Sequence, residues 1–288
     1  MTMTLDHAEL VADRVVTTEP QAPAAPRARR RRGALSQRNL AILGGQAITV
    51  AAVLGLLQWL VDSGRVGTIY LASPTQILRV FPHLITQEHL FGNLLITLYE
   101  AVVGTVLAFV IGVATGTWMG LSRAGERFLN PFVAAAMAVP KVTIIPLLTL
   151  YLGVGVNHKI VIVFLFGYFL FVFNTIAGIR QVQDSHLKVA RAHGASRLQT
   201  IVKVILPSAA PSIVAALRVE TGTALVAALF GEIVASKAGL GNMLNRAIGV
   251  YDTAKLFALV LSITVFSVLI ITAVDLLEKK VLLRWKYV

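Results

Sequence analysis

The chain contains no cysteine and few charged residues, and both absences limit what it can be. Without cysteine it can form neither disulfide bonds nor thiolate metal sites. Only 14% of its 288 residues are charged, whereas 56% are hydrophobic, which is unlike the composition of a soluble globular domain. The composition therefore favours an integral membrane protein, and the length suits one membrane domain with several spans and short tails.

The sequence also lacks the common motifs of nucleotide binding and hydrolytic catalysis. It has no GxxxxGK[ST] loop for the phosphates of ATP and no HExxH pair for a catalytic zinc ion. It has no GxSxG turn to carry a serine nucleophile. We therefore expect that the chain is not an enzyme and that it binds no cofactor or metal ion of its own.

Acidic residues are scarce relative to basic ones, which gives a formal net charge of +12. Such a balance can indicate nucleic-acid binding, but in membrane proteins Lys and Arg gather on the cytoplasmic connections, and we expect no nucleic-acid partner. The polar, basic residues 1–39 predict a disordered cytoplasmic tail, followed by a membrane domain at 40–288. The run Arg29–Arg32 in this tail can also contact anionic membrane lipid.

Long apolar segments follow, each close to the roughly 20 residues that a membrane-crossing helix needs. They predict an all-helical protein with six transmembrane helices, at 41–61, 94–119, 132–152, 160–179, 211–234 and 256–274. In the second segment, Gly104, Gly112 and Gly116 are spaced to allow close packing against another helix. Pro140 and Pro146 interrupt the third segment.

The positions of Lys and Arg predict the orientation of the chain. If the N-terminus is cytoplasmic, the outer connections carry few basic residues, namely Arg65, Arg79, Lys159, Lys237, Arg246 and Lys255. Apart from Lys141 and Arg218 within spans, the other basic residues fall in the tails and inner connections. This asymmetry predicts a multi-pass protein of the cell membrane with both termini in the cytoplasm.

A polar stretch at 184–211 separates the fourth and fifth predicted spans. Asp184 or Ser185 can cap a first short helix, and Gly194 supplies the left-handed position that commonly ends one. Ser196 and Gln199 match a capping box, which predicts that a second helix begins at once.

The second helix has one apolar face, formed by Leu198, Ile201, Val202, Ile205 and Leu206. Pro207 is expected to end it, because proline lacks the amide hydrogen and clashes with the preceding turn. Two short helices would then meet at a glycine hinge between membrane spans and offer a compact surface to a partner.

The segments VARAHGAS and VILPSAAPSIVAALR resemble the EAA loop of binding-protein-dependent ABC importer permeases. VPKVTIIPLLTLYLGVG, FVFNTIAGIR and GEIVASKAGLGNML are similar to the nitrate/sulfonate/taurine branch of these permeases, and the resemblance runs from about Asn93 to the C-terminus. In one departure, Lys188 stands where the motif has its acidic residue.

The resemblance implies the permease subunit of an ATP-driven importer with an ABC type-1-like membrane domain. It implies a permease homodimer, cytoplasmic ABC ATPase subunits that bind ATP and Mg²⁺, and an extracytoplasmic solute-binding protein. The basic residue Lys141 within a span favours a small anionic solute such as nitrate, a sulfonate or taurine, while aromatic acids and vitamin precursors stay open. The residues implied in ATPase coupling are Lys188, Val189, Ala190, Gly194, Ala195, Leu198, Ile205, Leu206 and Pro207.

Charged residues inside predicted spans are costly unless they face a cavity or a partner. Four of them are candidates for the translocation path: Glu100, Lys141, Glu220 and Glu232. They can instead hold helices in register through ion pairs, for example between Lys141 and Glu220. Asp275 is expected at the inner membrane interface.

Two alternatives to the importer permease remain at this stage. An ion-coupled secondary transporter would use Glu100, Glu232 or Lys141 as its coupling site, and a membrane scaffold would use none. Neither needs the capped helix pair at 184–211. The outer connections 62–92, with a predicted amphipathic helix at 74–85 capped by Ser73, and 237–255, with a turn and helix, can face the solute-binding protein or close the bundle.

Overall fold

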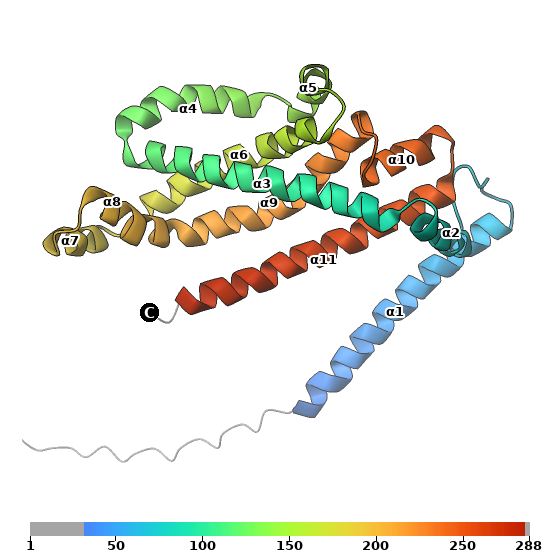
Figure 1. Cartoon of the computed structure of the whole chain (residues 1–288). Helices are drawn as coiled ribbons and strands as arrows, with labels where there is room; N and C mark the ends of the chain where they lie inside the picture. Colours follow the sequence, from blue (N-terminus) through green and yellow to red (C-terminus); the bar gives the residue numbers. More distant parts are fainter. Residues whose placement is uncertain (1–31, 286–288) are drawn as a thin grey trace, which may run out of the picture. The chain divides into compact units, whose positions relative to one another are not determined.

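The computed structural model describes residues 32–285, which are predominantly helical and contain no strand (Figure 1). The expected all-helical fold is thus confirmed for this part of the chain. The α-helices are α1 Arg32–Asp62, α2 Pro74–Thr86, α3 Leu90–Leu121, α4 Arg123–Ala138, α5 Ile145–Leu152, α6 Val156–Arg180, α7 Asp184–Ala192, α8 Arg197–Thr200, α9 Leu206–Val234, α10 Leu240–Gly249 and α11 Thr253–Trp285. A 3-10 helix, η1, covers Lys141–Ile144, and a π-helical turn, η2, covers Ile201–Ile205.

The chain divides into two units, residues 1–53 and 54–288, and each is considered by itself. Helix α1 begins at Arg32, so residues 32–39 of the predicted tail are helical. The remainder of that tail, residues 1–31, lies outside the described residues, and its disorder stays a prediction.

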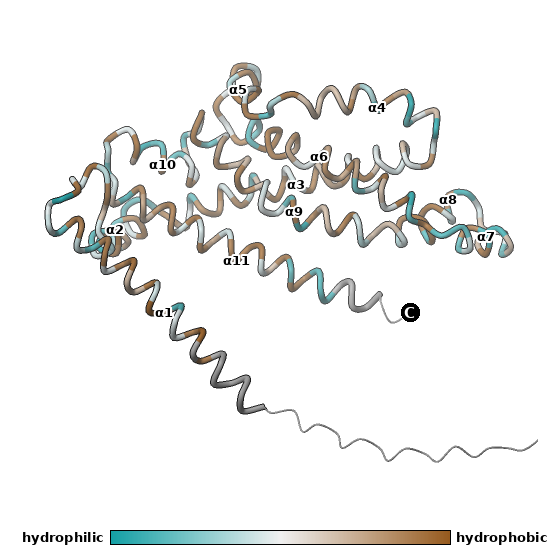
Figure 2. The backbone as a smooth tube through the Cα atoms, turned by 180° about the vertical axis from the view of Figure 1, so that it is seen from behind, coloured by the Kyte–Doolittle hydropathy of each residue, from teal (hydrophilic) through white to brown (hydrophobic). Residues whose placement is uncertain are grey.

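Five helical segments of the described chain are long and apolar enough to cross a membrane, and a bent pair can make a sixth. The apolar stretches along these helices are brown in Figure 2. The single helices are Ile42–Asp62, Leu90–Leu121, Val156–Arg180, Arg197–Val234 and Thr253–Lys280. The predicted six spans are therefore met when the bent pair, α4 with η1 and α5, counts as one.

The third predicted span is not one helix. Helix α4 already begins at Arg123 and ends at Ala138, and the chain then turns by 82° into η1 and α5. Pro140 explains the break, because a proline disfavours the helical conformation of the residue before it, and Val139 is extended with ψ 127°. Pro146 lies in the first turn of α5, where proline is tolerated, and does not interrupt the chain.

Helices α3, α6 and α9 form the centre of the second unit and run side by side (Figure 1). The glycines of α3 allow this approach. A Cβ atom at Gly104 would lie 2.5 Å from the Cβ of Val163, and one at Gly112 would lie 2.8 Å from the Cβ of Phe171. The predicted role of these glycines in close helix packing is confirmed.

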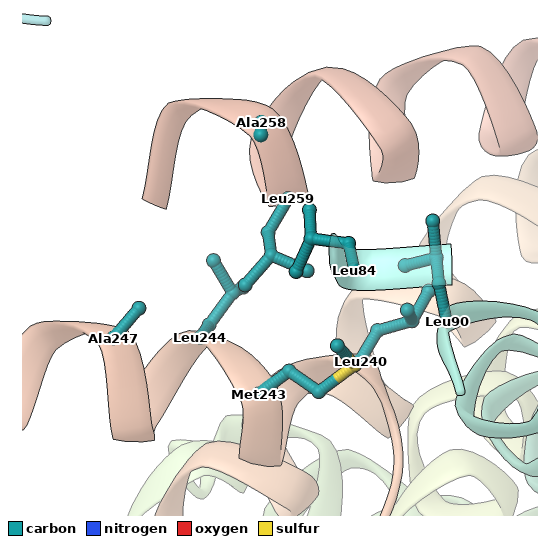
Figure 3. Packing of buried hydrophobic residues seen from close by; sticks show 8 residues of the cluster. All are labelled: Leu84, Leu90, Leu240, Met243, Leu244, Ala247, Ala258 and Leu259. Atoms are coloured by element: carbon teal, nitrogen blue, oxygen red, sulfur yellow. The ribbon is translucent and has the colours of Figure 1, made fainter. Parts of the chain in front are cut away.

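Helices α2 and α10 pack with the first turns of α3 and α11 at one end of this bundle, called here the α10 end. Ser73 caps α2 as predicted. Its hydroxyl oxygen accepts from the Gln76 amide at 3.3 Å, and the Gln76 side-chain oxygen accepts from the Ser73 amide at 3.0 Å. The apolar side chains that meet here are buried together (Figure 3): Leu84, Leu90, Leu240, Met243, Leu244, Ala247, Ala258 and Leu259. At the opposite end, called the α7 end, lie α7 and α8.

Candidate functional site

The hinge between α7 and α8 has the backbone geometry that the sequence predicts. Gly194 has a φ of +68°, in the left-handed region. The amide of Ala195 donates to the carbonyl of Ala190 at 3.0 Å, which closes the end of α7 in a Schellman-type turn. The predicted cap by Asp184 or Ser185 is wrong, because Gln183 occupies that position without a side-chain bond. Asp184 is the first helical residue, where its charge still favours the helix dipole.

The second helix begins as predicted but does not end as predicted. Ser196 accepts from the Gln199 amide at 3.3 Å, and the Gln199 side chain accepts from the Ser196 amide at 2.8 Å. Pro207 then fails to stop the helix, which continues to Val234. The π turn explains this: the Leu206 amide reaches back to the Ile201 carbonyl, and the widened turn accommodates a proline that has no amide to donate.

Three apolar side chains are exposed on the helical hairpin that α7, α8 and η2 form. Val189 is 58% exposed, Leu198 70% and Val202 54%, and together they are called the coupling surface. Exposed apolar side chains on a polar hairpin are typical of a surface that a protein partner covers.

The nine residues implied in coupling differ in exposure and fall into three groups. Lys188, Val189, Gly194 and Leu198 are exposed, and Ala195, Leu206 and Pro207 are partly buried. Ala190 and Ile205 are buried, and Ile205 packs with Ile179, Ala209 and Ile213. These last two coupling candidates are therefore placed to support the hairpin from inside rather than to touch a partner.

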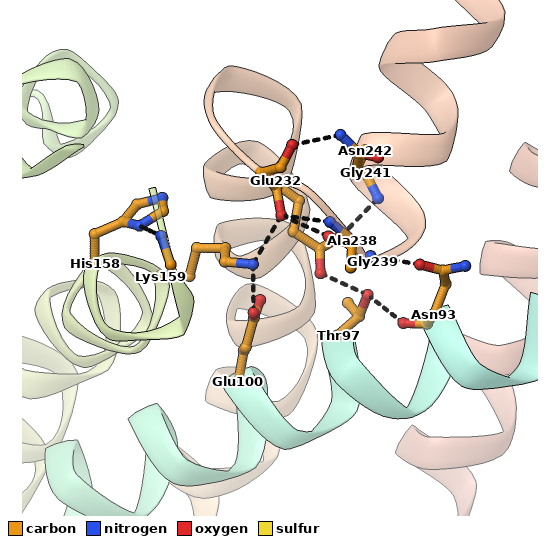
Figure 4. A network of polar contacts seen from close by, with 12 residues as sticks. Asn93, Thr97, Glu100, His158, Lys159, Glu232, Ala238, Gly239, Gly241 and Asn242 are labelled. Atoms are coloured by element: carbon orange, nitrogen blue, oxygen red, sulfur yellow. Dashed lines mark hydrogen bonds and ion pairs between the residues drawn. The ribbon is translucent and has the colours of Figure 1, made fainter. Parts of the chain in front are cut away.

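A second group of polar residues is buried toward the α10 end and joins α3, α6 and α9 (Figure 4). The Lys159 Nζ of α6 lies 2.5 Å from the Glu100 Oε1 of α3, and the two side chains are 3% and 0% exposed. The same ammonium donates to the Ser236 Oγ at 2.9 Å. Lys159 is not among the predicted site residues, because its place before a predicted span assigns it to an outer connection. The signal was its position directly before the predicted span 160–179.

Glu232 of α9 completes a buried charge cluster, which consists of Glu100, Lys159 and Glu232. Its two carboxylate oxygens accept from the Thr97 hydroxyl at 2.8 Å and from the Gly241 amide at 2.7 Å. Gly239, with a φ of +102°, packs so closely on this carboxylate that a Cβ atom there would overlap it. Glu232 therefore fastens the turn that leads into α10.

Glu220 lies deeper, where α3, α6 and α9 cross. One carboxylate oxygen accepts from the Thr223 hydroxyl at 2.7 Å, and the other is buried without a hydrogen-bond partner among the described residues. The carboxylate fits only because Gly167 has no side chain: a Cβ there would be 2.6 Å away. Ala108 of α3 closes the third side of this niche.

Lys141, the fourth path candidate, lies in η1 and is only partly buried. Its ammonium lies 5.5 Å from the ring centre of Phe166 and 5.4 Å from that of Phe169, within cation–π range. The ion pairs of the described residues do not join it to Glu220, so the expected structural pair is not formed in this conformation.

Arg218, the other basic residue within a predicted span, forms ion pairs between helices. It contacts Asp275 at 2.9 Å and Glu278 at 2.7 Å, so it links α9 to α11. No cluster of His, Asp and Glu in residues 32–285 has the arrangement of a metal site. The charged residues of the spans thus act within this conformation chiefly as links between helices.

Membrane-length helices, with α3, α6 and α9 closely packed at their centre, define a multi-pass membrane protein. Residues 104–283 match the family described as binding-protein-dependent transport system inner membrane component, and the chain belongs to this family. It is therefore a multi-pass ABC permease subunit and not an enzyme. The secondary-transporter and scaffold alternatives are set aside.

Relatives and solved structures agree with this assignment. The chain is 33% identical over 236 residues to an aliphatic sulfonates transport permease protein of Bacillus subtilis, covering 82% of this chain and 85% of the relative. It is 29% identical to a riboflavin transport system permease protein of Chloroflexus aurantiacus, covering 84% and 90%. Its fold is similar to that of the inward-facing MetNI methionine ABC transporter, with a TM-score of 0.60, 21% identity and coverage of 68% and 97%.

Proposed function

We propose that the chain forms the translocation path of an ATP-driven importer for a small sulfonate-type anion, taurine included. The observation that carries this proposal is the similarity to the aliphatic sulfonates permease over 82% of the chain. Lys141 supports it, because a partly buried cation with aromatic neighbours suits an anionic solute. The riboflavin relative is the reason to test the solute class directly.

The coupling surface is the proposed docking place of a cytoplasmic ATPase, which would bind the ATP and Mg²⁺ that this chain has no motif to bind. The α7 end would then be cytoplasmic, as would both termini. Closure of two ATPase subunits on nucleotide would draw the hairpins of two permease copies together. This movement would open the path toward the α10 end.

The remaining partners follow from the same proposal. Two copies of the chain would form a homodimer with the path between them, and an extracytoplasmic solute-binding protein would deliver the anion at the α10 end. Lys141 is partly accessible and is the proposed path residue. Glu100, Glu220 and Glu232 are fully buried here, so they would contact the solute only after the helices rearrange.

Uptake by the assembled transporter tests the proposal. Proteoliposomes that contain the permease, its ATPase and its binding protein should accumulate radiolabelled taurine or ethanesulfonate when ATP is present inside. Lys141→Met should lower uptake by about tenfold or more through loss of a charge-assisted contact, while ATP hydrolysis and assembly persist. Uptake of riboflavin without uptake of any sulfonate would overturn the proposed solute class.

A further inference from the structure

A polar pocket of about 430 Å³ opens at the α10 end of the bundle. Its walls come from the α2–α3 connection, from α3, from the turn and helix around α10, and from α11. The lining residues are Gln87, Glu88, His89, Asn93, Lys237, Asn242, Met243, Arg246 and Lys255. This volume lies in the range of small-molecule sites, roughly 300–1,000 Å³.

The charges of this pocket are unbalanced toward positive. Glu88 carries the one carboxylate in the lining, and it is paired with Lys255 at 2.5 Å. Lys237 and Arg246 are exposed and have no carboxylate within ion-pair distance among the described residues. A guanidinium and an ammonium on one wall are suited to an oxyanion, which accepts several charge-assisted hydrogen bonds.

Hydrogen bonds hold the pocket walls in place. The Arg246 guanidinium donates to the backbone carbonyl of Lys237 at 3.3 Å, which places it beside the Lys237 backbone. Asn93 accepts from the Gly239 amide at 2.7 Å, and Asn242 donates to the Ser236 carbonyl at 2.6 Å. Since Ser236 also accepts from Lys159, Asn242 of the pocket lining is connected through Ser236 to the buried charge cluster.

The rim of the pocket contains a residue in an unusual conformation. His89 has a φ of +50° and a ψ of 49°, the left-handed region that few residues other than glycine adopt. Its side chain makes no capping bond to α3, and its carbonyl oxygen accepts from the Asn93 side chain at 3.3 Å. Conformations of this kind are concentrated at ligand sites, where the surrounding structure maintains them.

We propose that this pocket is a low-affinity binding site for a small organic oxyanion, with Lys237 and Arg246 as the residues that bind its charged group. The inference rests on the proposed function, since it gives the imported anion a first contact on the permease at the α10 end. The site is distinct from Lys141, which lies in η1.

Binding of ethanesulfonate to the full-length chain tests this site without transport. The permease is purified with its ATPase subunits, without the solute-binding protein, and binding is followed by saturation-transfer NMR of the ligand. Ethanesulfonate should bind, whereas the neutral dimethyl sulfone should not. In the double variant Lys237→Gln with Arg246→Gln, the affinity should fall about tenfold or more, because charge-assisted hydrogen bonds are lost.

Arg123→Gln with Arg127→Gln is the matched control, because it removes two exposed positive charges from α4, away from the pocket. Its affinity for ethanesulfonate should be unchanged, and both variants should elute at the same volume as the unmodified complex. Equal affinity in the double variant, or no binding by the unmodified chain, would overturn the site. If sulfonate uptake persists in that case, only the pocket is lost. If ethanesulfonate binds but no sulfonate is taken up, the binding site is supported and the proposed sulfonate import is contradicted.

Discussion

Lys159 and Glu100 show how two buried charges can be tolerated at the same depth. Each would be costly to bury alone, and at 2.5 Å each compensates the other. Ser236 satisfies a further donor of the ammonium. The pair therefore matters less for the stability that it adds than for the instability that follows when one member is removed.

Lys159→Met should destabilise the protein by about 3–5 kcal/mol, because it leaves the Glu100 carboxylate buried without a cation. The double variant Lys159→Met with Glu100→Gln should recover most of this loss, since no charge then remains to be compensated. The free energy of unfolding in mixed detergent micelles measures both.

Lys141→Met is the control for that comparison, because Lys141 is partly accessible and forms no ion pair among the described residues. Its free energy of unfolding should change much less. Equal stability of Lys159→Met and the unmodified chain would show that the Glu100 carboxylate is not a compensated charge.

At the scale of helices, local sequence rules predicted the geometry where near neighbours alone decide it, at starts and ends alike. Ser73, Ser196 and Gly194 adopt the predicted geometry because capping and left-handed turns depend on near neighbours. The predicted helix end at Pro207 was wrong because a π turn precedes the proline and lets the helix continue through it. The Lys159–Glu100 pair could not be predicted from spacing alone, since it depends on how α3 and α6 pack.

Gly194→Val should disturb the α7–α8 hairpin and leave the membrane helices unchanged. A Cβ atom at this position would meet nothing within 4 Å, so the cost comes from the φ of +68° alone, about 1–3 kcal/mol for a β-branched residue. The variant should remain in the membrane at normal amounts, yet co-purify with much less ATPase because α8 is misaligned with α7.

Gly194→Asn is the matched variant, because asparagine tolerates the left-handed region. It should retain the ATPase, and Gly194→Ala should lie between the two. If the valine variant binds the ATPase as well as the asparagine variant does, the hairpin geometry is not what the partner recognises.

At the scale of the whole molecule, the absence of cysteine makes the orientation directly measurable. Ser63→Cys and Lys237→Cys should react with a membrane-impermeant maleimide added to spheroplasts. Lys188→Cys and Arg197→Cys should react only after the membrane is permeabilised. All four positions are exposed, so access rather than burial decides the labelling. Labelling of Lys188→Cys from outside would contradict the proposed ATPase docking.

The helix that starts at Arg197 runs without interruption to Val234, 38 residues that measure about 57 Å at 1.5 Å per residue. Its first turn carries Leu198 of the coupling surface, and its last turn carries Glu232. One continuous helix therefore connects the α7 end of the bundle with the α10 end. The π turn at Ile201–Ile205 departs from regular α-helical geometry close to the coupling surface, whereas the part that leads to Glu232 is regular α-helix.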